Sequence, residues 1–266
     1  MSKIQFILFS IILFVIAQNS ICQAQSYTIT VSAGAFDRSE TVTSFQFPES
    51  VEAGIYTMES ENGEVVQLQV DENGRGSFVL QSLEAGTSKN YSLSAGPLSI
   101  DSSQQNVNYV VDQNTISFKV SDKEVLSYYH GKNSPPEELD DRYKRSGYIH
   151  PVLSPDGTVL TNHLNPIHPH HSGIWSAWTN TRFQGRTPDF WNVHLNSGRV
   201  DGADSLETAW QGPVHAGFRA KHYFTDLSSS APVIALNEEW VVNIYDIGKS
   251  EDYHLFDLKV TQTVNT

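Results

Sequence analysis

Histidines and tryptophans crowd one segment of the 266-residue chain, from Tyr148 to Trp191. Five of the ten histidines fall within 22 residues of this segment, at His150, His163, His168, His170 and His171. Imidazole donates, accepts or ligates near neutral pH, so this density predicts an acid–base site or a metal site. The same residues also suit a polar core that holds a long loop together, and all three interpretations stay open at the level of sequence.

In the acid–base interpretation, imidazoles transfer protons to and from a polyol, and indole rings beside them provide a stacking surface. The candidate catalytic residues are His150, His163, His170, His171 and Asp189. The candidate substrate-binding residues are Asn162, Trp175, Trp178 and Trp191. Asp189 could place a carboxylate at the mouth of an aromatic pocket, or it could cap a buried turn.

In the metal interpretation, His168 and His170 are the ligands. Pro169 between them fixes its own φ and favours an extended residue before it. Two imidazoles at i and i+2 of an extended chain lie on one side and can bind Zn, Cu or Fe, while His171 would point to the other side. The sequence therefore leaves two possibilities for the cofactor, which are no cofactor or a divalent metal.

The remaining titratable residues carry less information. Five scattered histidines are interpreted as structural or surface residues: His130, His194, His215, His222 and His254. The cations before the cluster are interpreted as loop charges: Arg142, Lys144 and Arg145. Glu238 and Glu239 are neighbours on a predicted strand, so they face opposite sides and at most one can face a pocket.

The sequence lacks the motifs of several common enzyme classes. The chain has no Gly-rich phosphate loop, no Gly-x-Ser-x-Gly elbow and no His-Glu-x-x-His helix, so no nucleotide cofactor is expected. The formal net charge is −13, which repels a phosphate backbone and argues against a nucleic-acid partner.

The first 24 residues predict a cleaved secretory signal. Lys3 precedes an apolar run from Ile4 to Ala17, and Cys22-Gln23-Ala24 gives a small-x-small cleavage pattern. The run is too short for a comfortable membrane span, which takes about 20 residues. We expect cleavage after Ala24 and a periplasmic or extracellular protein with no span after cleavage. It would hold no cysteine, because Cys22 is the only one.

Alternation of apolar and polar residues predicts an all-β chain in two parts. Residues 25–100 contain short alternating runs separated by Asn62-Gly63 and Asn73-Gly74 turns, which predicts a small antiparallel β-sandwich. Residues 101–266 predict a larger antiparallel β-sandwich with the segment 148–191 as a long functional excursion. The chain stops soon after the last predicted strand, and a large sandwich needs more strands, so we expect this chain to be a fragment of a longer protein or a shortened relative. The strands are expected at 27–31, 65–70, 77–80, 108–111, 116–120, 124–129, 235–245 and 256–260.

Four short runs resemble one bacterial family. They are Tyr148-Ile149-His150-Pro151, Pro155-Asp156-Gly157, the run His168-Pro169-His170-His171-Ser172-Gly173-Ile174-Trp175, and Asp189-Phe190-Trp191. Together they resemble the exported proteins labelled PmoA family or methane oxygenase PmoA, over about residues 105–266. Two positions depart from that pattern: Ser146-Gly147 replaces Arg-Pro, and Ile167 replaces Asp, which weakens a carboxylate-assisted mechanism.

The resemblance implies an exported supersandwich-like protein that processes carbohydrate as an epimerase, lyase or hydrolase. Two alternatives remain. Aromatic platforms with polar neighbours suit a non-catalytic glycan-binding module equally well. The family label instead implies a metal-dependent oxidoreductase, which the metal content of the purified protein would test.

Overall fold

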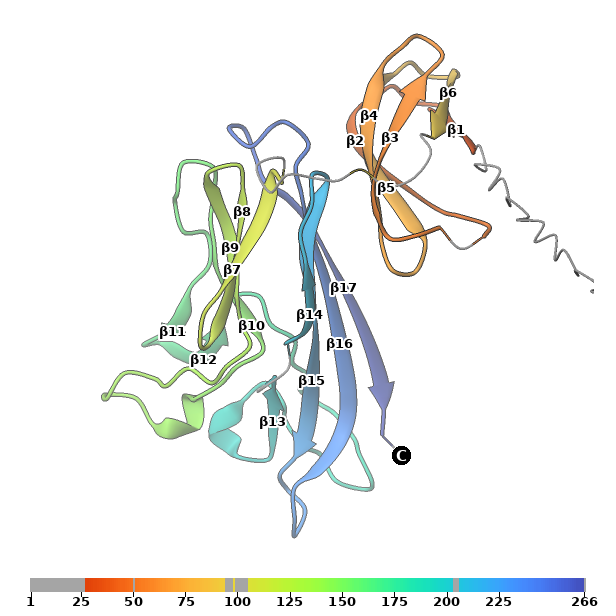
Figure 1. The fold of residues 1–266 in the computed structure, drawn as a ribbon. Helices are drawn as coiled ribbons and strands as arrows, with labels where there is room; N and C mark the ends of the chain where they lie inside the picture. Colours follow the sequence, from red (N-terminus) through yellow and green to blue (C-terminus); the bar gives the residue numbers. More distant parts are fainter. Residues whose placement is uncertain (1–26, 50, 94–97, 99–104, 203–205, 266) are drawn as a thin grey trace, which may run out of the picture.

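The computed structural model describes residues 27–49, 51–93, 98, 105–202 and 206–265, and these are built mainly of antiparallel strands (Figure 1). Helical structure in the described residues is limited to two three-residue 3-10 turns, η2 (Asp141–Tyr143) and η3 (Val193–Leu195). The predicted all-β class is therefore confirmed. The predicted signal lies outside the described residues. No helix in the described part of the chain has the length and apolarity needed to cross a membrane.

The first part is one six-stranded antiparallel sheet, in the order β1-β6-β3-β4-β5-β2. Its strands are β1 (Thr28–Ser32), β2 (Arg38–Gln46), β3 (Gly54–Ser60), β4 (Val65–Val70), β5 (Arg75–Leu83) and β6 (Ser88–Leu93). Strands β4 and β5 pair only at Gln69–Ser77 and Val70–Gly76, so the β2–β5 pair curls away from the other four strands. The curled sheet encloses its own core, where the Phe78 ring lies 5.5 Å from the Tyr91 ring.

Two predicted Asn-Gly turns join strands of this sheet. Gly63 and Gly74 have φ of 78° and 74°, in the left-handed region that glycine adopts at little cost. In the second turn the Asp71 carboxylate also accepts hydrogen bonds from the Asn73 and Arg75 amides, at 2.8 and 2.9 Å. Local turn chemistry therefore explains both hairpins, β3–β4 and β4–β5.

The second part contains two larger sheets and a short hairpin. The four-stranded sheet has the order β10-β9-β8-β7, and the five-stranded sheet has the order β13-β15-β16-β17 with β14 on β15. The strands are β7 (Val107–Val111), β8 (Thr115–Val120), β9 (Lys123–Tyr129), β10 (Tyr148–Val152), β11 (His163–Asn165), β12 (His168–Ser172), β13 (Gly198–Asp201), β14 (Leu206–Trp210), β15 (His215–Asp226), β16 (Val233–Tyr245) and β17 (Leu255–Val264).

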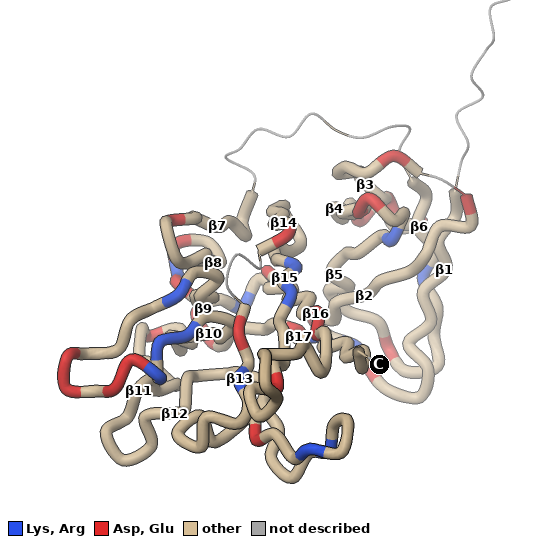
Figure 2. Tube along the Cα trace, turned by 90° about the horizontal axis from the view of Figure 1, so that it is seen from below, with Lys and Arg blue, Asp and Glu red and all other residues tan. Residues whose placement is uncertain are grey.

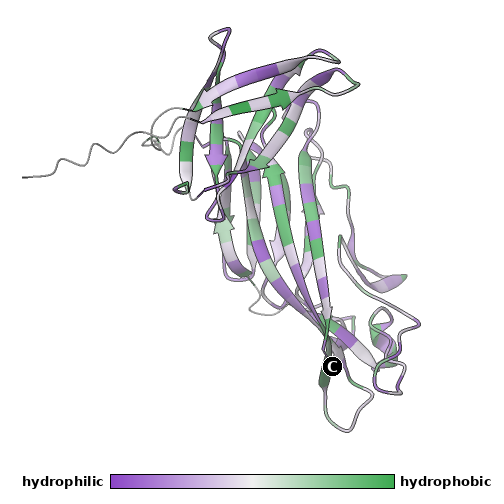
Figure 3. Cartoon of the chain, turned by 90° about the vertical axis from the view of Figure 1, so that its right-hand side faces the viewer, coloured by the Kyte–Doolittle hydropathy of each residue, from purple (hydrophilic) through white to green (hydrophobic). Residues whose placement is uncertain are grey.

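The two larger sheets pack face to face. Phe218 of β15 lies 5.7 Å from Phe118 of β8 and 4.5 Å from Tyr128 of β9, ring centre to ring centre. Buried residues of both sheets form one hydrophobic cluster. Hydrophobic and hydrophilic bands alternate along the long strands (Figure 3), and burial in β16 alternates in the same way. This alternation is what a sheet with one covered face requires.

The two parts are joined by a buried side chain, Gln69 of β4, and by a partly exposed ion pair at 3.6 Å between Glu40 and Lys249. The Gln69 amide nitrogen donates to the His215 carbonyl at 3.0 Å, and its amide oxygen accepts from the Val214 and His215 amides at 3.2 and 3.1 Å. A Cβ at Gly212 would lie 2.4 Å from the Gln69 oxygen, so glycine permits this approach. The contact orders the first sheet against the start of β15.

Candidate functional site

The histidine-rich segment folds back on β10 at one glycine. Ile149 and Ile174 exchange both backbone hydrogen bonds, at 2.9 and 3.0 Å. Gly173, just before Ile174, has φ of 54°, and a Cβ there would lie 2.0 Å from the Ile149 carbonyl oxygen. Only glycine fits this position without a shift of the backbone. The fold-back brings the end of β12, and Trp175 after it, next to β10.

A first group of rings surrounds His163 of β11. The Tyr148 ring stacks on the His163 ring with centres 4.5 Å apart, and the Tyr148 hydroxyl lies 3.1 Å from His163 Nε2. Asn133 donates to that hydroxyl at 3.3 Å, which leaves the phenol proton free to be donated to His163. The His150 ring centre lies 5.7 Å away, and His150 Nδ1 is 2.9 Å from the Thr161 hydroxyl.

Burial keeps both imidazoles of this group uncharged near neutral pH. It lowers the pKa of His163 to about 4, and the Arg145 charge and a protonated His150 both act in the same direction. Burial also lowers the pKa of His150. Burial raises the pKa of Tyr148, so its phenol stays protonated. Neutral imidazoles are proton acceptors, so the group supplies bases rather than cations.

A second group of rings forms on β12. The His171 ring lies 5.1 Å from the His168 ring and 4.4 Å from the His170 ring, centre to centre. The prediction that His171 points away from its two neighbours is therefore wrong, because its side chain turns back toward them. Trp191 lies 5.5 Å from His171 and 5.1 Å from Trp175, so two indoles border the imidazoles.

Arg145 lies between the two groups. Its guanidinium carbon is 4.2 Å from the centre of the Trp175 ring, and Nη1 donates to the His170 carbonyl at 3.1 Å. Only 6% of the residue is exposed. Burial lowers its pKa to about 10, so it stays charged at neutral pH. The interpretation of Arg145 as a loop charge is wrong, and sequence reasoning missed it because nothing in its neighbours predicts burial.

Asp189 shapes a turn. Oδ1 accepts from the Trp191 and Asn192 amides at 2.9 and 2.8 Å, and Oδ2 accepts from the Asn192 and Thr179 side chains at 2.9 and 3.0 Å. Burial raises the pKa of Asp189, but these hydrogen bonds outweigh it and leave the pKa lowered. Of the two roles open to this residue, the geometry favours the turn cap over a free acid or base.

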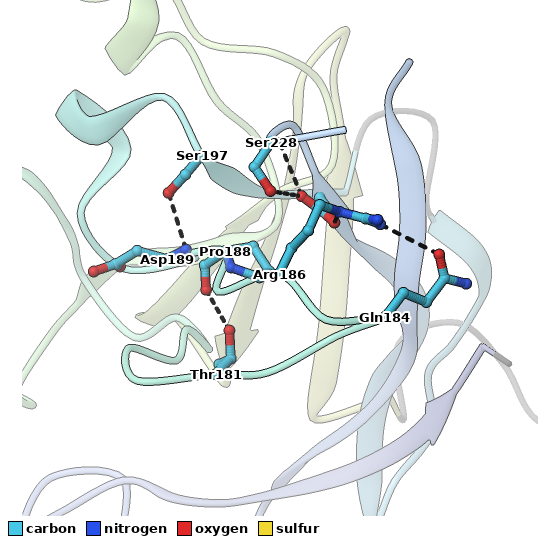
Figure 4. Close-up of polar contacts among 8 residues, drawn as sticks. Thr181, Gln184, Arg186, Pro188, Asp189, Ser197 and Ser228 are labelled. Carbon is cyan, nitrogen blue, oxygen red and sulfur yellow. Dashed lines mark hydrogen bonds and ion pairs between the residues drawn. The ribbon is translucent and has the colours of Figure 1, made fainter. Parts of the chain in front are cut away.

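The loop that carries Trp191 is anchored to the end of β15 (Figure 4). Arg186 Nε lies 2.7 Å from the buried carboxylate of Asp226, which also accepts from the Ser228 hydroxyl at 2.5 Å. The Asp189 amide donates to the Ser197 hydroxyl at 3.0 Å. These contacts hold the loop, and with it the indole of Trp191, in one position.

Two predicted substrate-binding residues lie outside both ring groups. The Trp178 side chain is 51% exposed, and its carbonyl accepts from the Phe190 amide at 2.9 Å. Asn162 is exposed, and its side chain accepts from the amide of His163 at 2.8 Å. Both positions border the site, whereas Trp175 and Trp191 belong to it.

The imidazoles do not converge as metal ligands. The His168 and His170 rings, the predicted ligand pair, lie 5.9 Å apart at an angle of 84°. Among the described residues, no group of three or more His, Cys, Asp and Glu side chains is placed to hold a metal ion. The arrangement therefore favours the acid–base interpretation of this segment over the metal interpretation.

Comparison with known families places the second part of the chain. A family of unknown function, DUF6807, matches residues 115–266, which is more than half of the chain. The chain belongs to the DUF6807 family. The match includes β8 to β17 and every ring of both groups, and it leaves out the curled first sheet. No curated protein matches the chain. The resemblance to PmoA proteins stays a prediction.

The DUF6807 region also holds a buried acid–imidazole pair that the sequence did not predict. His222 Nδ1 lies 2.9 Å from Glu238 Oε1, and His222 Nε2 lies 2.8 Å from the Tyr128 hydroxyl. Burial raises the pKa of Glu238, but hydrogen bonds from His222, Gln262 and Ser176 outweigh it and lower the pKa. Glu238 shares a strand face with the core residue Trp240, and this alternation could have predicted from the sequence that Glu238 is buried.

Proposed function

We propose that this DUF6807 protein binds a carbohydrate against Trp175 and Trp191 and acts on it with imidazole acid–base groups. The proposal is carried by two groups of rings in one segment: His150 and His163 are uncharged in the first group, and the second group places two indoles, 5.1 Å apart, beside His171. Indole faces stack on the apolar faces of sugar rings, and neutral imidazoles accept protons from hydroxyl groups, from activated C–H groups and from water. Epimerases, lyases and hydrolases all use that step.

Within this proposal His150 is the strongest candidate for the base. Its Nδ1 faces the Thr161 hydroxyl, which also accepts from the Val152 amide at 3.0 Å. The Thr161 oxygen has a second lone pair that can accept from Nδ1–H, and this tautomer would leave the lone pair of Nε2 free to take a proton. His163 is more enclosed, since Nε2 faces Tyr148 and Nδ1 is shielded from solvent without a partner. We assign His163 to the support of the site and His150 to contact with substrate.

His170 offers a clean test, because its contact with Arg145 uses the main-chain carbonyl. His170→Ala keeps that hydrogen bond and removes only the ring. We expect loss of at least 100-fold in turnover of a carbohydrate substrate, with a melting temperature within about 2 °C of the parent chain. Product formation from oligosaccharide mixtures, followed by mass spectrometry, supplies the activity measurement.

The matched control is His254→Gln, which changes a histidine of the β16–β17 connection far along the chain from both ring groups. It should keep full turnover. If His170→Ala and His150→Gln fold normally and turn over substrate at the parent rate, the acid–base proposal is wrong.

A non-catalytic glycan-binding role is the second candidate. It is favoured by the four hydrogen bonds that occupy Asp189, because the ring groups then contain no carboxylate free for chemistry. Under this alternative oligosaccharides bind, measured by titration calorimetry, but no product forms over days of incubation. Trp191→Ala would weaken binding under both proposals, so the product measurement separates them.

A further inference from the structure

A small hollow lies beside the second ring group, under the turn that leads into β10. Its lining includes the cationic residues Arg142, Lys144, Arg145 and Arg199, together with His170. No described residue that lines it is acidic. The volume is about 10 Å³, which is room for the tip of one small polar group. The basic and acidic positions of the preceding loop appear in blue and red to the left of β10 (Figure 2).

Two of these cations are already paired with acids. Arg142 lies 2.9 Å from Asp140, and Arg199 lies 2.9 Å from Asp201. Among the described residues, Lys144 and Arg145 have no carboxylate within 4.0 Å. Asp201 still attracts Arg145 at longer range and acts to raise its pKa, so Lys144 and Arg145 are the cations of the hollow that have no direct carboxylate partner.

Arg145 is the less usual of the two. The residue is 6% exposed, and its Nε is shielded from solvent with no hydrogen-bond partner. Charged groups are rarely buried without an opposite charge, because the loss of hydration is then not offset. Since Nη1 donates to the His170 carbonyl, the Nε–Nη2 edge remains, and carboxylates engage that edge through two parallel hydrogen bonds.

We propose that Arg145 and Lys144 bind one anionic substituent, a carboxylate or a sulfate ester, of the carbohydrate that the Trp175–Trp191 pair holds. This inference rests on the proposed function and names its substrate class as acidic sugars. The small hollow admits the tip of the substituent, and the sugar ring stays outside on the indoles. Trp175 would lie next to both the sugar ring and the anion site, because the Arg145 guanidinium lies on its ring.

The overall negative charge of the chain means that attraction of an acidic sugar must come from nearby residues. The formal net charge of −13 repels an acidic oligosaccharide at long range. Binding must then come from direct contact with the two unpaired cations, and it should weaken as salt screens them. A neutral sugar should show no such salt dependence.

The test compares three mixed panels of trisaccharides built on the same hexoses: uronic acids, sulfate esters and neutral sugars. Titration calorimetry with the purified protein should show at least tenfold tighter binding of one acidic panel than of the neutral panel. The panel that binds tighter identifies the substituent as a carboxylate or a sulfate. Arg145→Met should remove the preference, and Lys144→Gln, at an exposed position, should reduce it about threefold.

Lys259→Gln is the matched control, since it removes one exposed positive charge on β17, at the opposite edge of the sheet from β13. It should leave the preference unchanged. Should Arg145→Met fail to fold, Lys144→Gln decides the matter. Equal binding of neutral and acidic panels overturns this inference and leaves the proposed function standing. Binding of none of the panels overturns the proposed function as well.

Discussion

The guanidinium of Arg145 lies 4.2 Å from the centre of the Trp175 ring, and the arginine is almost fully buried there. The two residues are 30 positions apart and meet because Gly173 lets the chain close on β10. A guanidinium without a carboxylate partner gains attraction from the face of an aromatic ring. The pair therefore links the stability of the segment to the indole surface proposed to bind carbohydrate.

Replacing Trp175 should show how much this contact contributes to the free energy of unfolding. We expect Trp175→Leu to lower the free energy of unfolding by about 2 kcal/mol, the size of a desolvated cation–π contact. Trp178→Leu is the control, because this indole is 51% exposed, and it should cost less than about 0.5 kcal/mol. Urea denaturation measures both values. Equal losses in the two variants would contradict the assignment.

Gly173 should tolerate no side chain. In Gly173→Ala the new Cβ would meet the Ile149 carbonyl at 2.0 Å, so we expect a loss above about 4 kcal/mol or failure to fold. Gly157→Ala is matched, since Gly157 also has a positive φ, 85°, but open space around its Cβ position. It should cost only about 1 to 2 kcal/mol, the cost of the left-handed backbone. Thermal unfolding compares the two, and similar melting temperatures would disprove the steric argument.

Gln69 should couple the unfolding of the two parts. Gln69→Ala leaves the His215 amide and carbonyl and the Val214 amide without their partner, so we expect a loss of about 2 to 3 kcal/mol. We also expect the parent chain to unfold in one calorimetric transition and Gln69→Ala to unfold in two. Gln67→Ala changes an exposed residue of the same strand and should leave the transition unchanged. An unsplit, unshifted transition in Gln69→Ala would show that the contact contributes little.

Two buried imidazoles should make stability depend on pH. Burial lowers the pKa of both His163 and His215 to about 4, against 6.5 for an exposed imidazole. Between these values the unfolded chain binds more protons than the folded chain, so stability falls as pH decreases from 6.5 toward 4 and is constant above that window.

The double variant His163→Gln, His215→Gln should flatten the fall in melting temperature between pH 6.5 and 5, where carboxylates remain ionised. His168→Gln, at an exposed ring, is the control and should keep the parent slope. An unchanged slope in the double variant would mean that other groups set the pH dependence.

Local patterns were sufficient to predict much of the fold. All the strands expected from alternation were found, and β4 was predicted to the residue. The Asn-Gly turns were found as well, because a turn depends on the φ of one or two consecutive residues. The expected ranges do not include the other strands: β2, β3, β6 and β10 to β15. Among these, β13 and β14 are short edge strands that form by pairing with β15.

The sequence by itself determined where imidazoles and indoles gather, because their concentration is a property of consecutive residues. It could not determine which of them meet. The tertiary structure decided that Arg145 is buried on Trp175, that Asp189 caps a turn, and that His222 pairs with Glu238. Some of those contacts join residues that are distant in the chain. The others depend on how a side chain is rotated about its own bonds. Strand register and the closure at Gly173 place them, and no local periodicity encodes either.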